Sequence, residues 1–364
     1  MRAARLAAVV LALAGAGALA LVLTPGPVDA VAWTPPPDPG LSGAMAPNEH
    51  LVVAELVRAE AIYGPEDVAV GRDGALYAGM QDGRIVRLAP SGAATTLAQT
   101  GGRPLGLAWH PDGRLIVADA FKGLLAMEAD GTLEVLSTAA GGVPFGFTDD
   151  VDVAKDGRIY FTDASSRFDQ SEYQLDLLEG RPYGRLLRYD PADGSTTVLL
   201  DGLYFANGVA LSPAGDFVLV NETWRYRVRR LWLSGPRAGE DELFIDNLAG
   251  FPDGISTGSD GAFWVAMPSP RKANVDALSS RPWLKNLVAK LPEFAQPAAT
   301  RYGLVVRLNA AGAIVGSYHD SSGEHVWEVT SVEEHGGYLH LGSLTTDRIA
   351  RLPVPAVLHP PEAP

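Results

Sequence analysis

Four oxygen-bearing side chains occupy one position of a repeated sequence pattern. They are found in the phrases Gly-Pro-Glu66-Asp, Phe-Thr-Asp149-Asp, Ala-Asn207-Gly and Phe-Pro-Asp253-Gly. Each precedes an apolar stretch and lies eight residues before a glycine that recurs along the chain. Side chains at equivalent positions of repeats converge when the repeats surround an axis. Carboxylate and amide oxygens gathered in this way are typical ligands of a hard divalent cation.

The chemistry of this set favours Ca²⁺. Three facing carboxylates repel each other and retain protons unless a cation lies among them. The chain has no cysteine and no histidine pair in this pattern, which favours Ca²⁺ or Mg²⁺ over zinc. Asn207 favours Ca²⁺, because calcium accepts carbonyl oxygens alongside carboxylates. The sequence therefore predicts one cation site, with Ca²⁺ as the expected ion and Mg²⁺ or another divalent cation as alternatives, formed by Glu66, Asp149, Asn207 and Asp253.

A simpler interpretation is available for single members of the set. Asp or Asn before Gly is an ordinary turn pair, which accounts for Asn207 or Asp253 taken alone. It does not account for four donors at one offset from a repeated glycine. If a cation binds there, Asp253 is the predicted base or nucleophile, and Asp149 is the alternative that the sequence does not separate from it. The neighbouring Asp67 and Asp150 are predicted to orient the ligands.

The repeat itself is a polar turn, a glycine and three to five β-prone residues. It occurs six times, with spacings of 39, 44, 58, 46 and 76 residues between successive glycines. These spacings bracket the roughly 40 to 50 residues of a four-stranded blade. The predicted fold is therefore all-β, a six-bladed β-propeller over residues 51–354, in which segment 51–57 completes the last blade. The repeated glycines are Gly74, Gly113, Gly157, Gly215, Gly261 and Gly337.

Two intervals are longer than a blade needs, namely residues 167–184 and 269–303. Both interrupt the strand pattern and are predicted to be helical or irregular lids. The second interval predicts a helix that either packs on the propeller rim or forms a flap over a pocket. Its apolar residues at helical spacing are Trp283, Leu284, Leu287, Val288 and Leu291.

The first thirty residues are predicted to be a membrane anchor or a signal segment. Arg2 and Arg5 precede an apolar run from Leu6 to Leu23, whose length lies between a signal-peptide core and a bilayer span. No Lys or Arg follows until Arg58, so the remainder is predicted to lie outside the cytoplasmic membrane, anchored or, after cleavage, secreted. Residues 31–50, rich in Pro and Gly, are a predicted linker, and residues 355–364 a C-terminal tail.

The composition limits the possible partners. With 47% hydrophobic and 20% charged residues, the chain has the material for a folded core. Its net charge of −14 argues against a nucleic-acid partner and suits cations and neutral small molecules. The absence of cysteine excludes disulfides and cysteine nucleophiles.

Several phrases in order resemble the strictosidine synthase-like group, which is related to the senescence marker protein/gluconolactonase and paraoxonase families. They are the four phrases above together with the long run from Asp149 to Asp163 and the run Asn207-Gly-Val-Ala-Leu-Ser-Pro. The resemblance implies a six-bladed propeller in which Glu, Asn, Asn and Asp hold a catalytic Ca²⁺ that serves hydrolysis of lactones, aryl esters or organophosphates. Asp149 stands where those hydrolases usually carry Asn, so this site is more negative by one charge.

The resemblance does not extend to every activity of the group. Strictosidine synthase depends on a glutamate of its last blade that aligns at about Thr330, so condensation of an amine with an aldehyde is not predicted. The nearby Glu328, Glu333 and Glu334 are interpreted as ordinary strand and turn residues, and His110 as a surface turn residue.

Two functions follow from these observations. The predicted function is Ca²⁺-dependent hydrolysis of a small ester or lactone, in which the cation polarises the carbonyl group. The alternative is a non-catalytic, membrane-anchored propeller that keeps a structural Ca²⁺ and binds a ligand or a protein.

Overall fold

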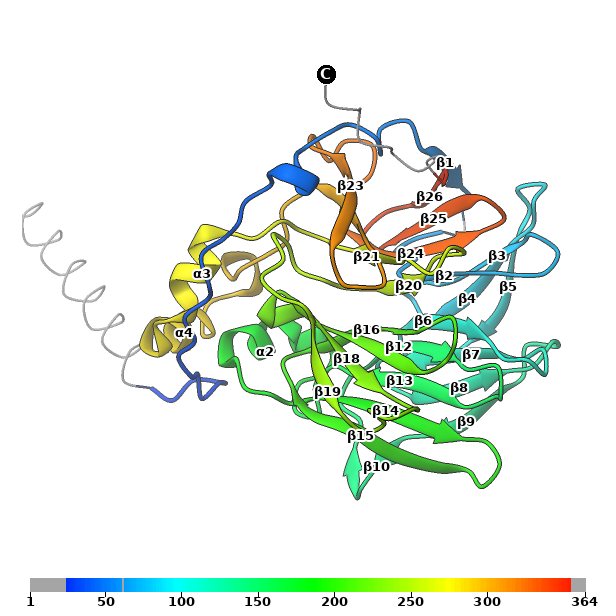
Figure 1. Cartoon of the computed structure of the whole chain (residues 1–364), viewed down its shortest axis with the longest axis horizontal. Coiled ribbons are helices and arrows are strands. Elements are labelled where there is room, and N and C mark those ends of the chain that lie inside the picture. Colours follow the sequence, from blue (N-terminus) through cyan, green and yellow to red (C-terminus); the bar gives the residue numbers. More distant parts are fainter. Residues whose placement is uncertain (1–23, 61, 355–364) are drawn as a thin grey trace, which may run out of the picture.

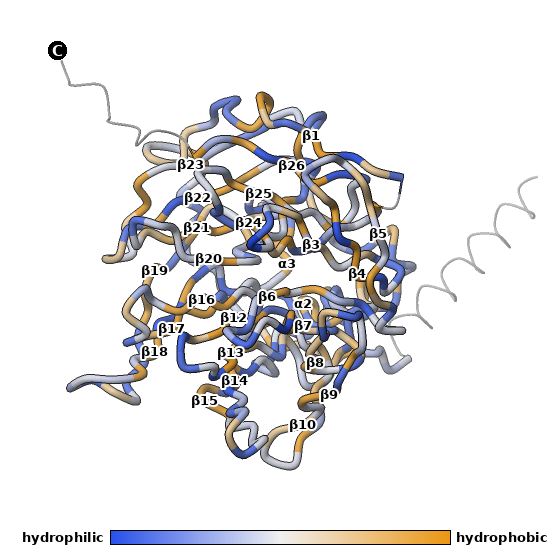
Figure 2. Tube along the Cα trace, turned by 90° about the vertical axis from the view of Figure 1, so that its right-hand side faces the viewer, coloured by the Kyte–Doolittle hydropathy of each residue, from blue (hydrophilic) through white to orange (hydrophobic). Residues whose placement is uncertain are grey.

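The computed structural model describes residues 24–60 and 62–354. The predictions for the apolar run and for the C-terminal tail fall outside these residues. Six four-stranded antiparallel sheets make up the described chain, each sheet being one blade. Their innermost strands surround a central channel (Figure 2). The prediction of an all-β six-bladed propeller is confirmed.

The blades follow the chain in order, each beginning with its innermost strand. The first three blades are β2 (Val68–Val70), β3 (Leu76–Gly79), β4 (Arg84–Leu88) and β5 (Ala94–Gln99); β6 (Pro104–Trp109), β7 (Leu115–Asp119), β8 (Gly123–Met127) and β9 (Leu133–Ser137); and β12 (Thr148–Val153), β13 (Ile159–Asp163), β14 (Gly184–Asp190) and β15 (Ser195–Leu203). The other three are β16 (Ala206–Leu211), β17 (Phe217–Glu222), β18 (Arg227–Trp232) and β19 (Asp241–Ile245); β20 (Ile255–Thr257), β21 (Phe263–Ala266), β22 (Gly303–Leu308) and β23 (Ile314–Asp320); and β24 (Val329–His335), β25 (Tyr338–Ser343), β26 (Arg348–Pro353) and β1 (Glu55–Arg58). A small hairpin adds β10 (Ala139–Ala140) and β11 (Val143–Pro144).

The last blade joins the two ends of the propeller. Strand β1 pairs antiparallel with β26, with Glu55 opposite Arg351, so an early segment completes the last blade as predicted. The strand begins at Glu55 rather than at Leu51, because residues 51–54 form a turn in which the Ala54 N–H donates to the Leu51 carbonyl at 3.1 Å. That turn buries the Leu51 side chain completely in the core.

The repeated glycines lie in the hairpin turns between the first and second strands, as predicted. Gly113, for example, has a φ of +100°, a conformation that side chains with a Cβ rarely adopt. The strands that follow pack their side chains between blades, and Ile116, Phe161 and Leu187 belong to one such buried cluster.

Four of the six innermost strands carry a β-bulge near their first residues. The register shifts between Pro104 and Leu107, Thr148 and Val151, Ala206 and Val209, and Val329 and Ser331. A bulge turns a side chain out of the alternating pattern of a strand. These bulges fall at or beside the repeat position that the sequence singled out, so the fold itself directs that position toward the channel.

Carboxylates also join neighbouring innermost strands, which belong to different sheets. Asp67 accepts a hydrogen bond from the Leu107 N–H at 2.8 Å, and Asp150 accepts one from the Val209 N–H at 2.8 Å. These hydrogen bonds connect neighbouring blades and fix the spacing between them. Asp67 and Asp150 each directly follow a predicted ligand, so the spacing is fixed next to the ligand positions.

Helices gather at one end of the channel (Figure 1). The insertion in the third blade contains α2 (Tyr173–Glu179), and the insertion in the fifth blade contains α3 (Ala273–Ser279) and α4 (Pro282–Val288). Short 3-10 helices are η1 (Gly43–Met45), η2 (Gln170–Glu172), η3 (Thr223–Arg225) and η4 (Glu293–Ala295). Within the described ranges, no helix has the length and hydropathy needed to cross a membrane.

The second insertion differs from the single packed helix expected around Trp283. It forms two helices, because Pro282 lacks the N–H that a helix interior needs and instead begins α4. Trp283 is 68% exposed, so its place in the apolar stripe was predicted wrongly. Residues 31–42 pass the helices without regular structure, and the Trp33 N–H donates to the Ser279 carbonyl at 3.0 Å. The 3-10 helix η1 then packs against β23.

Candidate active site

A cavity of about 240 Å³ lies between the channel and the helices. One residue from each blade lines it at the repeat position, and we call these six the ring residues: Glu66, Leu105, Asp149, Asn207, Asp253 and Thr330. The structure thus brings the four predicted ligands to a single cavity. In the sixth blade the offset of eight residues falls on Val329, which is buried between blades instead. The hairpin between β24 and β25 has two residues, whereas those between the first two strands of the other five blades have five, so Gly337 lies seven residues after its ring position, Thr330.

The backbone of the ring is held by the blades on either side. The Thr330 hydroxyl donates to the Glu66 carbonyl at 2.8 Å. Asp253 accepts from the Gly208 N–H through its carbonyl, and its own N–H donates to Ala266, both at 3.0 Å. Because these contacts use the main chain of Glu66 and Asp253, the carboxylates of both residues remain available to the cavity.

Burial and mutual repulsion perturb the ring carboxyls. Burial raises the pKa of Glu66 well above its ordinary value, and the charges of Asp253 and Asp149 raise it further. Burial and the charge of Asp253 raise the pKa of Asp149 in the same way. Burial raises the pKa of Asp253 to about 7, against a hydrogen bond from Asn207 that lowers it. Burial and mutual repulsion therefore favour protonated ring carboxyls, and the charge of the buried Arg103 opposes this at Glu66.

The donor set fits a hard cation in its chemistry. All the polar ring side chains offer oxygen, and Asp149 Oδ2 is buried without a hydrogen-bond partner, which is unusual for a carboxylate and indicates a missing positive partner. Among residues 24–60 and 62–354, however, no three Asp, Glu, His or Cys side chains are arranged to hold a metal ion as they stand. The four predicted ligands therefore line one cavity, and their arrangement around a single ion stays a prediction.

The sequence analysis did not identify the residues that form the wall of this cavity. Residues two positions before four of the six ring residues line the same cavity. They are Phe147, Phe205, Phe251 and Glu328. Phe205 stacks against Trp224 with ring centroids 4.5 Å apart. The signal was present in the triplets Phe-Thr-Asp, Phe-Ala-Asn and Phe-Pro-Asp, which place a phenylalanine two residues before three of the four donors.

Glu328 lies on this wall and is more than the ordinary strand residue that the sequence suggested. Its φ is +48°, a strained backbone for a residue with a Cβ. The carboxylate accepts a hydrogen bond from the Thr345 hydroxyl at 2.5 Å. By contrast, Glu333 lines a second cavity of about 330 Å³ beyond the ring, and Glu334 accepts from the Trp264 indole at 2.7 Å.

The interpretation of His110 as a surface residue was wrong. It stands in the turn before Gly113, but its side chain is buried. Its Nε2 lies 3.1 Å from the Gly157 carbonyl of the next blade. The side chain therefore contributes to contact between blades, because the hairpin turns of adjacent blades approach each other there.

A buried carboxyl connects the lid to the wall. Asp176 of α2 accepts a hydrogen bond from the Trp224 indole at 2.9 Å, and burial raises its pKa to about 7. When folding raises the pKa of a carboxyl group, that group stabilises the folded protein at pH values below its pKa in the unfolded chain. The stabilisation is lost as the pH rises through its pKa in the folded protein.

We therefore expect Asp176→Asn to remove much of the fall in stability that the parent shows between about pH 4 and pH 7. The amide oxygen of asparagine still accepts from Trp224, but it carries no proton to lose. At pH 8 the variant should be more stable than the parent by on the order of a few kcal/mol, at about 1.4 kcal/mol for each pKa unit. Melting temperatures across the pH range test this prediction, and parallel curves for parent and variant would contradict it.

Comparisons with known proteins agree with this geometry. The family model described as strictosidine synthase matches residues 149–236, and the model of the N-terminal part of strictosidine synthase-like proteins matches residues 43–88. The human adipocyte plasma membrane-associated protein is 40% identical over 362 residues, covering 93% of this chain and 86% of the relative. The chain belongs to the strictosidine synthase-like family. An Arabidopsis thaliana protein named strictosidine synthase-like 6 is 37% identical over 314 residues, covering 84% of this chain and 83% of that relative.

Solved structures share the fold of this strictosidine synthase-like protein. A gluconolactonase from Xanthomonas campestris superposes with a TM-score of 0.61 at 17% identity, covering 92% of this chain and 99% of that one. Regucalcin, a calcium-binding protein from Agrobacterium tumefaciens, gives 0.59 at 17% identity, covering 82% and 93%. At these identities the likeness concerns the propeller fold.

Proposed function

We propose that this protein is a divalent-cation-dependent hydrolase of small esters or lactones. The observation that carries the proposal is the convergence of Glu66, Asp149, Asn207 and Asp253, from four blades, on one cavity with an apolar wall. The calcium-binding protein and the gluconolactonase of the same fold are consistent with it.

The four side chains would hold the cation, with Ca²⁺ as the expected ion. When bound, it supplies a positive charge that polarises a substrate carbonyl and stabilises negative charge on its oxygen. The buried Asp149 oxygen that lacks a partner would then gain one.

Asp253 is the proposed general base. It is less buried than Glu66, Asp149 and Asn207, so its carboxylate can meet a water molecule in the cavity, and Asn207 orients it. The carboxylate accepts a proton as the water oxygen attacks the carbonyl carbon. Returning that proton to the leaving oxygen completes cleavage to an acid and an alcohol, or to a hydroxy acid from a lactone. Asp149 is the alternative base.

The wall selects substrates with an apolar portion. Phe205, Trp224 and Phe251 present aromatic faces, and Tyr173 and Leu177 of α2 cover them from the lid. Such a surface holds an alkyl or aryl group next to the ring by burying its apolar area. The second candidate function is a non-catalytic propeller that binds such a ligand, or a protein, and keeps a structural cation. The same cavity serves that function without turnover.

An activity panel separates the two functions. Purified protein, replete with Ca²⁺, is assayed on aryl esters and on lactones of increasing chain length, then again after chelation and after Ca²⁺ is restored. We expect turnover that disappears with chelation and returns with the ion. Absence of turnover across the panel in replete protein would reject the hydrolase and leave the binding function.

A further inference from the structure

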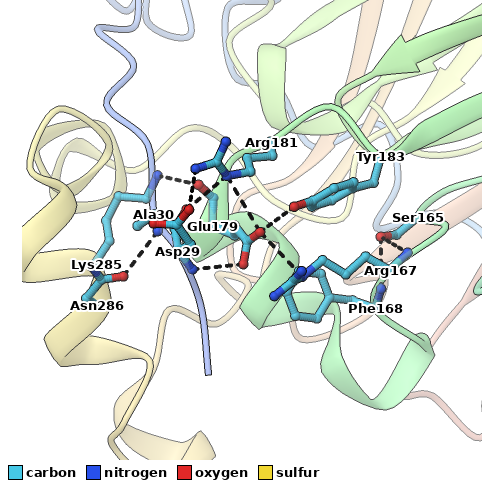
Figure 3. A network of polar contacts seen from close by, with 10 residues as sticks. All are labelled: Asp29, Ala30, Ser165, Arg167, Phe168, Glu179, Arg181, Tyr183, Lys285 and Asn286. Atoms are coloured by element: carbon cyan, nitrogen blue, oxygen red, sulfur yellow. Dashed lines mark hydrogen bonds and ion pairs between the residues drawn. The ribbon is translucent and has the colours of Figure 1, made fainter. Parts of the chain in front are cut away.

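A strap formed by residues 24–46 fastens the chain to the lid helices (Figure 3). The Asp29 N–H donates to the Glu179 carboxylate at 3.0 Å, and the Ala30 N–H donates to the Asn286 side chain at 3.2 Å. Lys285 of α4 donates to the Val31 carbonyl at 2.8 Å. The strap therefore contacts α2 and α4 together, although the two helices belong to different blades.

The centre of this junction is buried and polar. Glu179 is fully buried and accepts from the Tyr183 hydroxyl at 2.5 Å, whereas the ion pair of Arg181 with Asp29 at 2.5 Å lies at the exposed edge of the junction. Lys285 is only 3% exposed. Buried groups with several polar partners are costly to separate, so the strap and the two helices move as one unit.

The outer part of the second insertion exposes aromatic side chains. Trp283 in α4 is 68% exposed and Phe294 in η4 is 91% exposed. The segment is also basic in a chain of net charge −14, since residues 271–301 contain six Lys or Arg against two Asp or Glu. Arg271 and Lys285 are buried, and four basic side chains remain for the surface, namely Lys272, Arg281, Lys290 and Arg301. Aromatic residues beside basic ones are typical of surfaces that lie at a membrane interface.

The sequence places the predicted membrane segment next to this surface. The apolar run ends at Leu23, directly before Thr24, the first residue of the strap. The Lys290 ammonium, just after α4, donates to the Thr24 carbonyl. A bilayer that received the apolar run would therefore lie against α4 and η4.

We propose that the outer face of the segment 271–301 docks on a bilayer surface rich in anionic phospholipid, with Trp283 and Phe294 at the level of the headgroups. The strap then holds the lid, and with it the mouth of the aromatic cavity, against the membrane. Apolar substrates dissolved in the bilayer would reach the cavity from that side. The proposed docking does not depend on hydrolysis in the cavity. It depends on the predicted extracytoplasmic location at the membrane.

The absence of cysteine allows single labels to test the docking. Trp283→Cys, Phe294→Cys and, as the matched control, Val135→Cys each receive an environment-sensitive fluorophore on the full chain. Val135 is 60% exposed on β9, across the molecule from α4 (Figure 1). The labelled proteins are placed in nanodiscs of phosphatidylcholine with or without phosphatidylserine.

We expect the labels at 283 and 294 to shift to shorter wavelength and to resist quenching by iodide in nanodiscs with phosphatidylserine, and high salt to weaken both effects. The label at 135 should remain open to iodide. Equal exposure of all three labels in anionic nanodiscs would overturn the proposal. Complete protection of positions 283 and 294 without phosphatidylserine, unchanged by salt, would also overturn it. Protection of these positions only after another protein is added would do the same.

Discussion

Asp253→Asn is expected to lower ester or lactone hydrolysis by roughly 10²- to 10⁴-fold, the range typical of a lost general base. The substitution keeps the shape of the side chain and an oxygen toward Asn207, but it removes both the proton acceptor and one of three ring charges. Because Asp253 also raises the pKa of Glu66 and Asp149 through its charge, its neutralisation should ease ionisation of the other two carboxyls.

Steady-state kinetics of the variant, with Ca²⁺ in excess, measure the effect. Asp130→Asn, in an exposed turn between β8 and β9, is the matched control and should retain parental turnover. If Asp253→Asn retains more than about a tenth of the parental kcat at saturating Ca²⁺, well inside that range, the base lies elsewhere, and Asp149→Asn becomes the next variant to assay.

Asp163→Ala is expected to destabilise the protein by about 3–5 kcal/mol, the usual effect of removing one partner from a buried ion pair. Asp163 is completely buried and pairs with Arg185 at 2.5 Å. Its other oxygen accepts the N–H groups of Gly146 and Phe147 at 3.0 and 2.9 Å. These residues lead directly into Asp149, so the same carboxylate that neutralises Arg185 also positions one ring residue and one wall residue.

The loss should appear as a fall of roughly 10 °C in melting temperature and as reduced activity at temperatures where the variant is folded. Asp156→Ala, which breaks the exposed pair with Arg158 in the same blade, is the control and should change the melting temperature little. A variant Asp163→Ala that melts with the control would show that the buried pair does not organise this blade.

The sequence was sufficient for the repeat and for most of the ring. The glycines at Gly113 and its equivalents mark turns that only a residue without a Cβ adopts readily, so they record the blade period directly. Counting from them found Glu66, Asp149, Asn207 and Asp253 because those inner strands keep one offset. The count failed in the last blade, where the residue eight before Gly337 is Val329 and the ring position is Thr330. The reason is the shorter hairpin between β24 and β25, which has two residues instead of five and therefore places its glycine closer to the ring position.

The wall and the lid were harder to predict for different reasons. In the sequence, Phe147, Phe205 and Phe251 look like ordinary core residues. Phenylalanine is typical both of a protein core and of the wall of an apolar cavity, so only the position of the ring residues distinguishes the two. The three lid helices α2, α3 and α4 are only seven residues each, too short to show a clear apolar period. Their arrangement depends on the strap, whose contacts with Glu179 and Lys285 join segments about 150 and 250 residues apart, and no local pattern encodes those contacts.

Calcium binding measured by titration calorimetry on the parent and on Glu66→Ala tests the central claim most directly. The claim requires that oxygens from four blades share one ion, and Glu66 contributes from the first blade. We predict that the metal-depleted parent binds one Ca²⁺ per chain at the ring and that its melting temperature rises with added Ca²⁺. Glu66→Ala should lose that binding and that response. Equal affinity and an equal thermal response in parent and Glu66→Ala would contradict the cation site and the hydrolytic mechanism that depends on it.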